Sequence, residues 1–358
     1  MITFLIYILA FIIITLLLFG VGSQLIIYAD AVSEKTKISQ LWIGMILLSI
    51  ITSLPELVSN LAAVLIIHEP NLALGNIIGS NIFNLTILFV IEMIFIGNSI
   101  FNVIHKNYIK AIKLSLVITG IILLQIVFFT NVKPVNFLGI NFYPDLSVGF
   151  ISGASILIFI GYFTGIKFYM KDLSFDEESL PVEEKYLHLS KQTVIFRFIF
   201  FGALIVILGI IMSILADKIA LFELKLKYSS LILGHTFVGS LFLALATSLP
   251  ELVVSIQAIR KINSVNMAIG NIFGSNLFNL LIICISDIFY FRNPLFHDVS
   301  YSHIISIGVF VLMASIVSFG IMNKRKHKRT VSIESILILI IYIIYLFLIY
   351  HFRIIDTP

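Results

Sequence analysis

Two glutamates in strongly apolar surroundings are the residues of this chain whose type and spacing point most directly to chemistry. Glu56 follows Pro55 in the segment TSLPE, and Glu251 follows Pro250 in an identical segment 195 residues later. Proline has no N–H and displaces the carbonyl four residues before it, so each segment should offer a free carbonyl beside a carboxylate. A carboxylate near the middle of a membrane span costs about 3 kcal/mol or more on insertion scales. In a membrane, such a pair therefore needs a cation or a proton to compensate it.

The duplication extends well beyond the glutamates. Residues 52–87 align with residues 247–282 without a gap, and 21 of the 36 aligned positions are identical. Because the identity includes polar residues, apolar composition alone does not explain it. Each copy ends in GSNxFN, whose serine and second asparagine are spaced i, i+4 and share one helix face. These positions are Ser80, Asn84, Ser275 and Asn279.

The polar side chains of the paired TSLPE and GSNxFN motifs are typical ligands of a hard cation. They comprise two carboxylates, several hydroxyls and several amides, without a thiol or an imidazole. This set suits Ca²⁺ or Na⁺ and does not suit Zn²⁺ or Cu⁺. Ser, Thr, Gly and Asn in membrane spans also serve helix packing, so the GSN segments alone fit either interpretation. The hydroxyls beside the glutamates are those of Thr52, Ser53, Thr247 and Ser248.

The composition is that of a polytopic membrane protein. Of the 358 residues, 59% are hydrophobic and 12% are charged, and the mean hydropathy is +1.10. Apolar runs of 18 or more residues recur along nearly the whole chain, which predicts an all-α membrane protein with about ten transmembrane helices. The expected spans are 2–29, 39–67, 70–96, 108–130, 146–170, 192–217, 229–259, 264–290, 301–322 and 332–352. The first has the length of a span and lacks the features of a cleaved signal. The single cysteine, Cys284, excludes an internal disulfide.

The positions of the basic residues predict the orientation. With ten spans, 17 Lys and Arg residues fall on the side of the odd-numbered loops, and 6 fall on the other side. The positive-inside rule then places both termini outside and the polar segment 172–190 in the cytoplasm. That acidic segment is expected to be a solvated linker, with a weak regulatory cation site as the alternative. The run KRKHKR at 324–329 is expected to anchor the topology near anionic lipid, and a nucleic-acid partner is not expected.

The two copies lie on expected spans 2–3 and 7–8. Five spans separate them, so the two halves should enter the membrane in opposite directions, as in transporters built from inverted-topology repeats. The predicted organisation is a first five-helix repeat over 1–171, a cytoplasmic acidic linker over 172–190 and a second five-helix repeat over 191–358.

The paired TSLPE…GNxxGSNxFN segments resemble the α-repeats of the cation/Ca²⁺ exchanger superfamily, of which sodium/calcium exchangers are the best-known branch. The motifs cover about 72 residues directly, while the ten spans and mirrored halves fit the whole chain. The resemblance implies that Glu56 and Glu251 bind Ca²⁺ and Na⁺, and that the first and sixth spans slide against a rigid core. It further implies that the remaining ligands are Thr52, Ser53, Thr247, Ser248, Ser80, Ser275, Asn84 and Asn279, with the backbone carbonyls of Ser49 and Ala244.

The chain departs from the family pattern at two positions. Asn279 stands where many sodium/calcium exchangers have an aspartate, so the site keeps two formal negative charges. One Ca²⁺ or two Na⁺ would neutralise it, while three Na⁺ would leave a costly buried positive charge, which places the usual 3:1 coupling in doubt. Ile51 stands where a glycine is common, which could alter packing at the helix break. Separately, Glu92 and Asp287 differ by 195 and are hypothesised to attract cations to the two mouths of the site.

The leading interpretation is an antiporter that exchanges Ca²⁺ for Na⁺ by alternating access at the two-glutamate site. A Ca²⁺/H⁺ antiporter of the same fold is the nearest alternative, because glutamates also carry protons. A passive cation channel is less favoured, because the paired residues build one central site rather than a filter. Motifs of hydrolases or nucleotide-driven pumps are not found, so neither an enzyme, a nucleotide nor a cofactor is expected. Short loops favour a prokaryotic plasma membrane.

Overall fold

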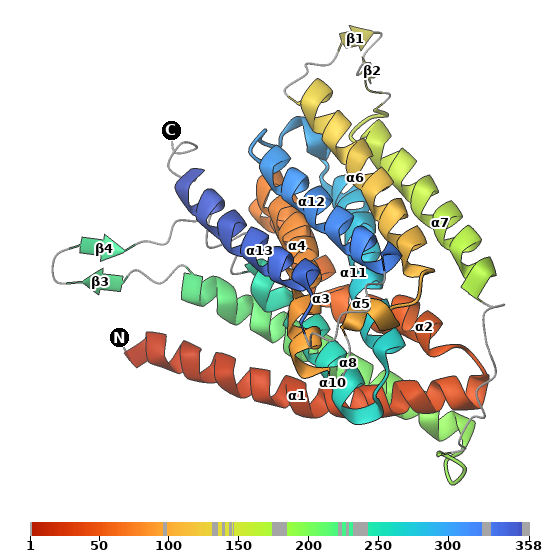
Figure 1. The fold of residues 1–358 in the computed structure, drawn as a ribbon. Helices are drawn as coiled ribbons and strands as arrows, with labels where there is room; N and C mark the ends of the chain where they lie inside the picture. Colours follow the sequence, from red (N-terminus) through yellow and green to blue (C-terminus); the bar gives the residue numbers. More distant parts are fainter. Residues whose placement is uncertain are drawn as a thin grey trace.

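The protein is almost entirely helical in a computed structural model (Figure 1). The structure describes residues 2–95, 99–130, 135–137, 140–142, 145, 147–173, 185–220, 224–226, 229–231, 243–323 and 331–352. Segments 232–242, 324–330 and most of the acidic linker, 174–184, lie outside these described residues.

The first half contains five long helical segments. They are α1 (Ile2–Thr36), a continuous run of α2 (Gln40–Trp42), the π-helical η1 (Ile43–Leu48), α3 (Ser49–Ala62) and the π-helical η2 (Ala63–Ile67), then α4 (Pro70–Ile94), α6 (Tyr108–Phe129) and α7 (Gly153–Leu173). The short helix α5 (Ile100–Val103) lies between α4 and α6. A hairpin of β1 (Val135–Phe137) and β2 (Ile140–Phe142) pairs Asn136 with Asn141.

The second half repeats the succession of five long helical segments, but its hairpin follows the first of them instead of the fourth. It contains α8 (Lys191–Ala220), a hairpin of β3 (Leu224–Leu226) and β4 (Ser229–Leu231) that pairs Lys225 with Ser230, helical residues 243–247 leading into α10 (Leu249–Ile262), α11 (Val265–Phe289), the 3₁₀ turn η3 (Leu295–His297), α12 (His303–Met322) and α13 (Ile333–Phe352). Eight helices of the described chain are long and apolar enough to cross a membrane, and two shorter apolar helices lie within α7 and α13. These ten helical segments correspond to the ten predicted spans.

Three predicted boundaries are wrong. The first helix continues to Thr36 rather than ending at residue 29, because Asp30 and Glu34 find hydrogen-bond donors in Gln40 and in the backbone at Tyr186. The fifth begins at residue 153 rather than 146, because a turn with Gly149 at φ +63° precedes it. The seventh does not begin at 229, since residues 229–231 form β4.

The backbone repeats with the same 195-residue offset as the sequence. Helix α4 begins at residue 70 and ends at 94, and α11 begins at 265 and ends at 289. Before each helix the chain turns through a left-handed residue, His68 (φ 60°) and Asn263 (φ 51°). Asparagine tolerates that conformation well, and Pro70 can occupy the first turn of α4, where an N–H would have no helical partner. The turn is therefore duplicated even where the residue types differ.

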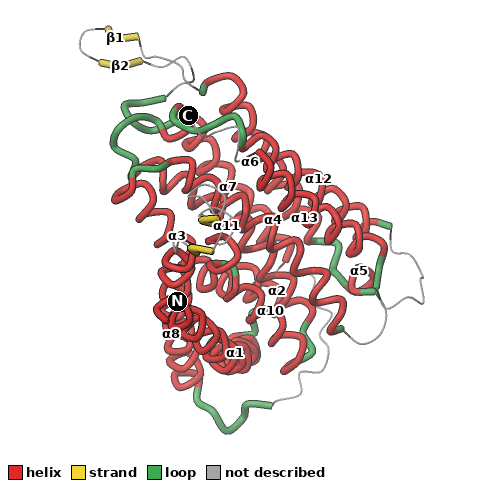
Figure 2. Tube along the Cα trace, turned by 90° about the vertical axis from the view of Figure 1, so that its left-hand side faces the viewer, coloured by secondary structure: helices red, strands yellow, loops and turns green. Residues whose placement is uncertain are grey.

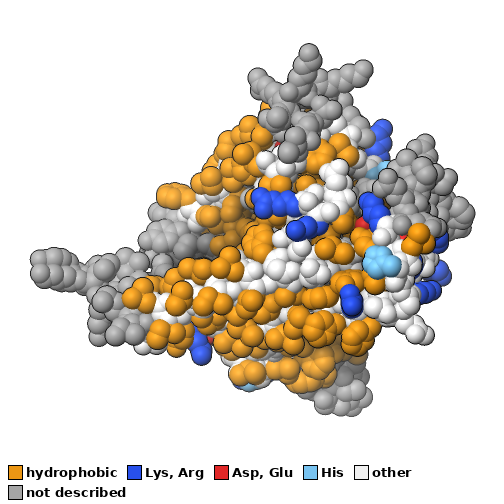
Figure 3. Space-filling view, turned by 90° about the horizontal axis from the view of Figure 1, so that it is seen from below, with side chains coloured by type: hydrophobic (Ala, Val, Ile, Leu, Met, Phe, Trp, Pro, Cys, Tyr) orange, Lys and Arg blue, Asp and Glu red, His pale blue; other side chains and the backbone are white. Residues whose placement is uncertain are grey.

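Helices α1 and α8 lie side by side along one flank of the bundle (Figures 1 and 2). They contact α3 and α10, the helices that carry the two glutamates. The outer faces of both helices carry exposed apolar side chains, among them Leu9, Leu16, Ile199 and Ile207. Seen from below, the surface is mostly hydrophobic with few charges (Figure 3). A surface of this kind fits the acyl region of a bilayer.

Glu92 and Asp287 occupy equivalent places, but they do not line the mouths of a site. Glu92 is 1% exposed and Asp287 is fully buried. Glu92 accepts hydrogen bonds from the backbone N–H groups of Ile100 and Ser332, and Asp287 accepts them from Leu295 and Ser152. The hypothesis that they attract cations is therefore wrong, because all these contacts are structural.

Each of these carboxylates joins the two halves. Ile100 and Leu295 both lie eight residues after the carboxylate of their own repeat, whereas Ser332 and Ser152 precede α13 and α7 of the opposite repeat. The carboxylate at the end of the third span in one half thus anchors the start of the fifth span in the other. Charge-assisted bonds of this kind are about twice as strong as neutral ones.

We expect Glu92→Gln to lower the free energy of unfolding by about 2 kcal/mol, because an amide nitrogen would face backbone donors in place of a carboxylate oxygen. Thermal unfolding of the purified protein in detergent measures this change. Glu69→Gln, at an exposed position, is the control and should change little. An unaltered melting temperature in Glu92→Gln, combined with weaker cation binding from one side only, would restore the mouth hypothesis.

Candidate cation-binding site

The two TSLPE segments lie on helices with different backbone geometry beside the glutamates. In the first half Pro55 is inside α3, which follows the π-helical segment η1. In the second half the helix is interrupted at Ser248 (φ −87°, ψ 4°), and Pro250 lies in the first turn of α10. The predicted helix break is therefore found before Pro250, whereas the α-helix continues through Pro55. Both keep the following glutamate fully buried.

Each glutamate is held by a serine of the opposite half. Ser53 Oγ donates a hydrogen bond to Glu251 Oε1 at 2.8 Å, and Ser248 Oγ donates one to Glu56 Oε1 at 3.1 Å. Both contacts join positions related by the 195-residue offset, so they form a pseudo-symmetric pair. The two glutamates are also close enough to interact electrostatically. The two repeats therefore build one site rather than two.

Several oxygen atoms in this region are buried without a hydrogen-bond partner among the described residues. They are Glu56 Oε2, Glu251 Oε2, Ser80 Oγ, Asn84 Oδ1 and Asn279 Oδ1. An unsatisfied buried polar group costs about 1–3 kcal/mol. These five oxygens therefore indicate a site for a ligand that oxygen atoms coordinate, such as a cation. These five oxygens belong to residues that the sequence proposes as ligands, while Asn84 Nδ2 and Asn276 Oδ1 are also without a partner among the described residues.

The remaining predicted ligands surround these atoms. Thr52 Oγ1 is 3.3 Å from Ser275 Oγ, and Ser275 Oγ also donates to Glu251 Oε1 at 3.3 Å. The carbonyl of Ser49 lies 3.4 Å from Thr52 Oγ1, and that of Ala244 lies 3.3 Å from Thr247 Oγ1. Ser80 and Asn84 make no hydrogen bond within the described chain, but they are buried on α4, which packs against α10 and α11.

Four buried asparagines were missed in the sequence. They are Asn76 and Asn271, which accept from the site threonines, and Asn81 and Asn276, which link α4 to α11. The signal was available, because all four are identical between the two repeats. Asn279 Nδ2 donates to Asn81 Oδ1 at 3.0 Å, so the Oδ1 atom of Asn279 itself points away from Asn81. Asn279 therefore offers an oxygen but no charge.

Helix α8 crosses the site at a glycine. A Cβ at Gly209 would overlap Cγ of Pro55 and would lie 3.3 Å from Cγ of Pro250. The same helix accommodates the unusual Ile51, because a Cβ at Gly202 would lie 2.9 Å from Ile51 Cδ1. The missing glycine at position 51 is thus matched by a glycine on the facing helix.

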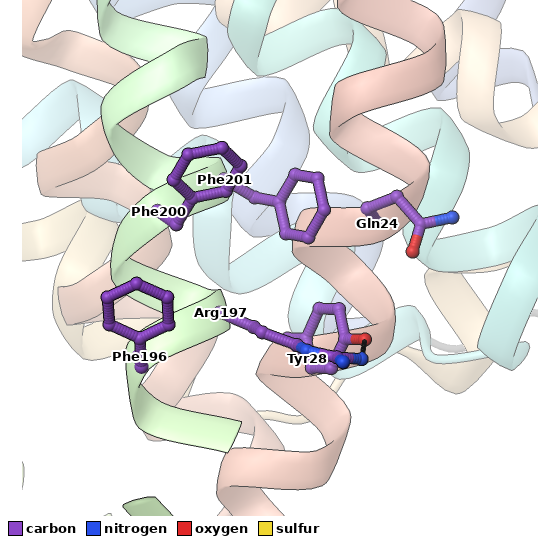
Figure 4. Close-up of a pocket in the computed structure, with 6 residues that line it drawn as sticks. All are labelled: Gln24, Tyr28, Phe196, Arg197, Phe200 and Phe201. Carbon is purple, nitrogen blue, oxygen red and sulfur yellow. Dashed lines mark hydrogen bonds between the residues drawn. The ribbon is translucent and has the colours of Figure 1, made fainter. Parts of the chain in front are cut away.

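A hollow of about 430 Å³ lies between α1 and α8 (Figure 4). The guanidinium of Arg197, in the lining of this hollow, lies 5.4 Å from the centre of the Tyr28 ring and donates a hydrogen bond to the Tyr28 hydroxyl. The hollow is aromatic and positively charged, and its lining contains no carboxylate, so it does not suit a cation. It is lined by Gln24, Tyr28, Phe196, Arg197, Phe200 and Phe201.

The family model described as "Sodium/calcium exchanger protein" matches residues 6–169 and 193–351. The chain belongs to this family. It is a membrane ion exchanger by family and fold rather than an enzyme, and its fold consists of two inverted five-helix repeats. The match covers both halves separately, as expected from the duplicated motifs.

Relatives of this exchanger occur in bacteria and archaea. It is 26% identical to the inner membrane protein YrbG of Escherichia coli over 76% of this chain and 77% of that protein. It is 28% identical to the sodium/calcium exchanger MaX1 of Methanosarcina acetivorans over 32% of this chain and 31% of that protein. The sodium-calcium exchanger NCX_Mj, soaked with Na⁺ and Sr²⁺, has the same fold, with a TM-score of 0.63, 23% identity and coverage of 95% and 97%.

We expect Gly209→Ala to lower the free energy of unfolding by about 1–3 kcal/mol, because the added methyl group would overlap a rigid proline ring. The matched control is Gly20→Ala on α1, where a Cβ meets nothing within 4 Å. That control should raise stability by up to about 1 kcal/mol through helix propensity. Thermal unfolding in detergent compares the two. Equal melting temperatures would contradict the close contact between α8 and the proline.

Proposed function

We propose that this protein exchanges Ca²⁺ for Na⁺ across the membrane by alternating access at Glu56 and Glu251. The observation that carries the proposal is the state of the two buried carboxylates. Each has one oxygen held by a serine of the other repeat and a second oxygen without a partner among the described residues. Together with the unpartnered oxygens of Ser80, Asn84 and Asn279, they provide the ligand types of a Ca²⁺ site.

The neutral oxygen ligands near the carboxylates favour Na⁺ over H⁺ as the counter-ion. Protonation of Glu56 and Glu251 would neutralise their charges, but it would leave the oxygens of Ser80, Asn84 and Asn279 without partners. Na⁺ is a hard cation that uses neutral oxygen ligands as well as charged ones. The names of MaX1 and NCX_Mj as sodium/calcium exchangers agree with this choice.

Switching of access rests on α1 and α8. These helices contact α3 and α10 beside the site, and their outer faces are apolar. Movement of this pair would expose the site to one side and then to the other, while an empty site with two charges would not cross the apolar barrier. The positive-inside distribution places both termini outside and residues 172–190 in the cytoplasm of a prokaryotic cell. The division into halves 1–171 and 191–358 stays a prediction.

The test is uptake of radioactive calcium into proteoliposomes loaded with Na⁺, beside proteoliposomes that carry only a pH gradient. We expect Na⁺-driven uptake that falls by at least about 100-fold in Glu56→Gln and in Glu251→Gln, because each change removes half of the site's charge. Glu69→Gln, at an exposed position, is the matched control. Uptake driven only by the pH gradient would assign H⁺ as the counter-ion. Flux that ignores both gradients would indicate a channel.

Charge balance predicts the coupling ratio. The site has two carboxylates, and Asn279 is neutral, so one Ca²⁺ or two Na⁺ compensate it. We expect exchange of two Na⁺ per Ca²⁺, which moves no net charge and is therefore insensitive to membrane potential. Calcium uptake with and without an imposed K⁺ diffusion potential measures this. Uptake accelerated by an inside-positive or inside-negative potential would show that a third ion moves or that the site changes its protonation.

A further inference from the structure

A chain of hydrogen bonds leads away from each site threonine. In the first, Thr52 Oγ1 donates to Asn271 Oδ1 at 3.1 Å, and Asn271 Nδ2 donates to Ser255 Oγ at 3.1 Å. Ser255 Oγ then donates to the carbonyl of Ala268 at 3.3 Å. All four residues are buried. The chain begins at the candidate ion site and ends on the backbone of α11.

The second chain occupies the equivalent positions of the other half. Thr247 Oγ1 lies 3.5 Å from Asn76 Oδ1, and Asn76 Nδ2 donates to Asn60 Oδ1 at 2.8 Å. Asn60 Nδ2 donates to the carbonyl of Ala73 at 3.1 Å. The offset of 195 residues holds at every step, but Asn60 takes the place of Ser255. Two different side chains thus perform the same connection.

The backbone carbonyls at the ends of the two hydrogen-bond chains fix which group donates and which accepts at every step. A backbone carbonyl only accepts, so Ser255 and Asn60 must donate to it. Ser255 Oγ can then accept only from the Nδ2 side of Asn271, which also donates to the carbonyl of Glu251 at 3.3 Å. Asn60 likewise presents Oδ1 to Asn76, because its Nδ2 faces Ala73 and the hydroxyl of Ser286. Asn76 and Asn271 must therefore turn Oδ1 towards Thr247 and Thr52, respectively.

An acceptor in that position decides where the threonine hydrogen points. Each hydroxyl has one hydrogen and two lone pairs, and a cation requires a lone pair. The competing acceptors include the carbonyls of Ser49, 3.4 Å from Thr52 Oγ1, and of Ala244, 3.3 Å from Thr247 Oγ1. Ser275 Oγ, 3.3 Å from Thr52 Oγ1, is a further one. A hydrogen directed at either carbonyl would occupy an oxygen that the cation needs.

We propose that Asn76 and Asn271, each oriented by Asn60 or Ser255, are positioning residues that draw the threonine hydroxyl hydrogens away from the bound cation. The inference rests on the proposed function, because it assumes that a hard cation binds beside Thr52 and Thr247. With the hydrogen on the asparagine side, both the hydroxyl oxygen and the nearby carbonyl present lone pairs to the ion. The same arrangement disfavours an anion, which would require the hydrogen to face the site.

A double-mutant cycle on Thr247 and Asn76 tests this role. Calcium affinity of the full-length protein in detergent is measured for Asn76→Leu, Thr247→Val and the double variant, with thermal unfolding recorded in parallel. Loss of an outer-shell partner typically weakens metal affinity by about 10–100-fold. We expect each single variant to lose about tenfold, and the double variant to bind no more weakly than Thr247→Val alone, because Asn76 acts only through that hydroxyl.

The two hydrogen-bond chains differ by Asn60 in place of Ser255, and this difference provides a matched control. Asn60→Ser gives the second hydrogen-bond chain the serine of the first and keeps the direction of the hydrogen bonds, whereas Asn60→Leu removes the acceptor for Asn76. We expect Asn60→Ser to bind Ca²⁺ about tenfold more tightly than Asn60→Leu. If Asn76→Leu does not fold, this pair and the equivalent cycle on Thr52 and Asn271 provide the test.

Glu56→Gln and Glu251→Gln distinguish failure of the proposed function from failure of the positioning role. Unchanged calcium affinity in both glutamate variants would overturn the proposed function. Loss of affinity in those variants, with independent and multiplicative losses in Asn76→Leu and Thr247→Val, would overturn only the positioning role. Equal affinities for Asn60→Ser and Asn60→Leu would overturn it as well.

Discussion

The hydrogen bonds that Ser53 and Ser248 donate to the glutamates of the opposite repeat are the contacts on which the rest of the structure depends. A carboxylate removed from water needs donors and a compensating charge, and neither repeat supplies both by itself. Each repeat provides the serine that the other repeat's glutamate needs. The two halves must therefore meet at one place and in one register, which brings all the buried oxygens of the site together.

The surroundings of the site are polar to a depth that is unusual for a membrane interior. Behind the oxygens stand asparagines and serines that bond to one another and end on backbone carbonyls, such as those of Ala73 and Ala268. In a medium without water, every such group must find its partner inside the protein. Networks of this kind are stable only when nearly complete, so the few unpartnered oxygens stand out as the place where a ligand belongs.

The molecule combines two kinds of contact. Around α4 and α11, buried carboxylates bond to backbone N–H groups of the opposite half, which ties those helices firmly. Helices α1 and α8 approach α10 and α3 at glycines, with Gly22 beside Val253 and Gly209 beside Pro55, and neutral hydrogen bonds join Gln257 to Phe19 and Ser59 to Ser213. Packing contacts of this kind lose less on a small displacement than a directed charge-assisted bond does. The difference fits a tied core with a more loosely held pair of helices.

The sequence alone determined that there are about ten helical segments, two repeats and a pair of glutamates, because apolar length and duplication are local properties of the chain, and the ligand types stay a prediction. It did not reveal that Glu92 and Asp287 bond to the opposite half, that Gly202 accommodates Ile51, or that Asn76 and Asn271 turn their oxygens towards threonines. Those facts depend on partners more than 100 residues away, and the direction of a hydrogen bond exists only once both partners are in place. Only the tertiary structure decided them.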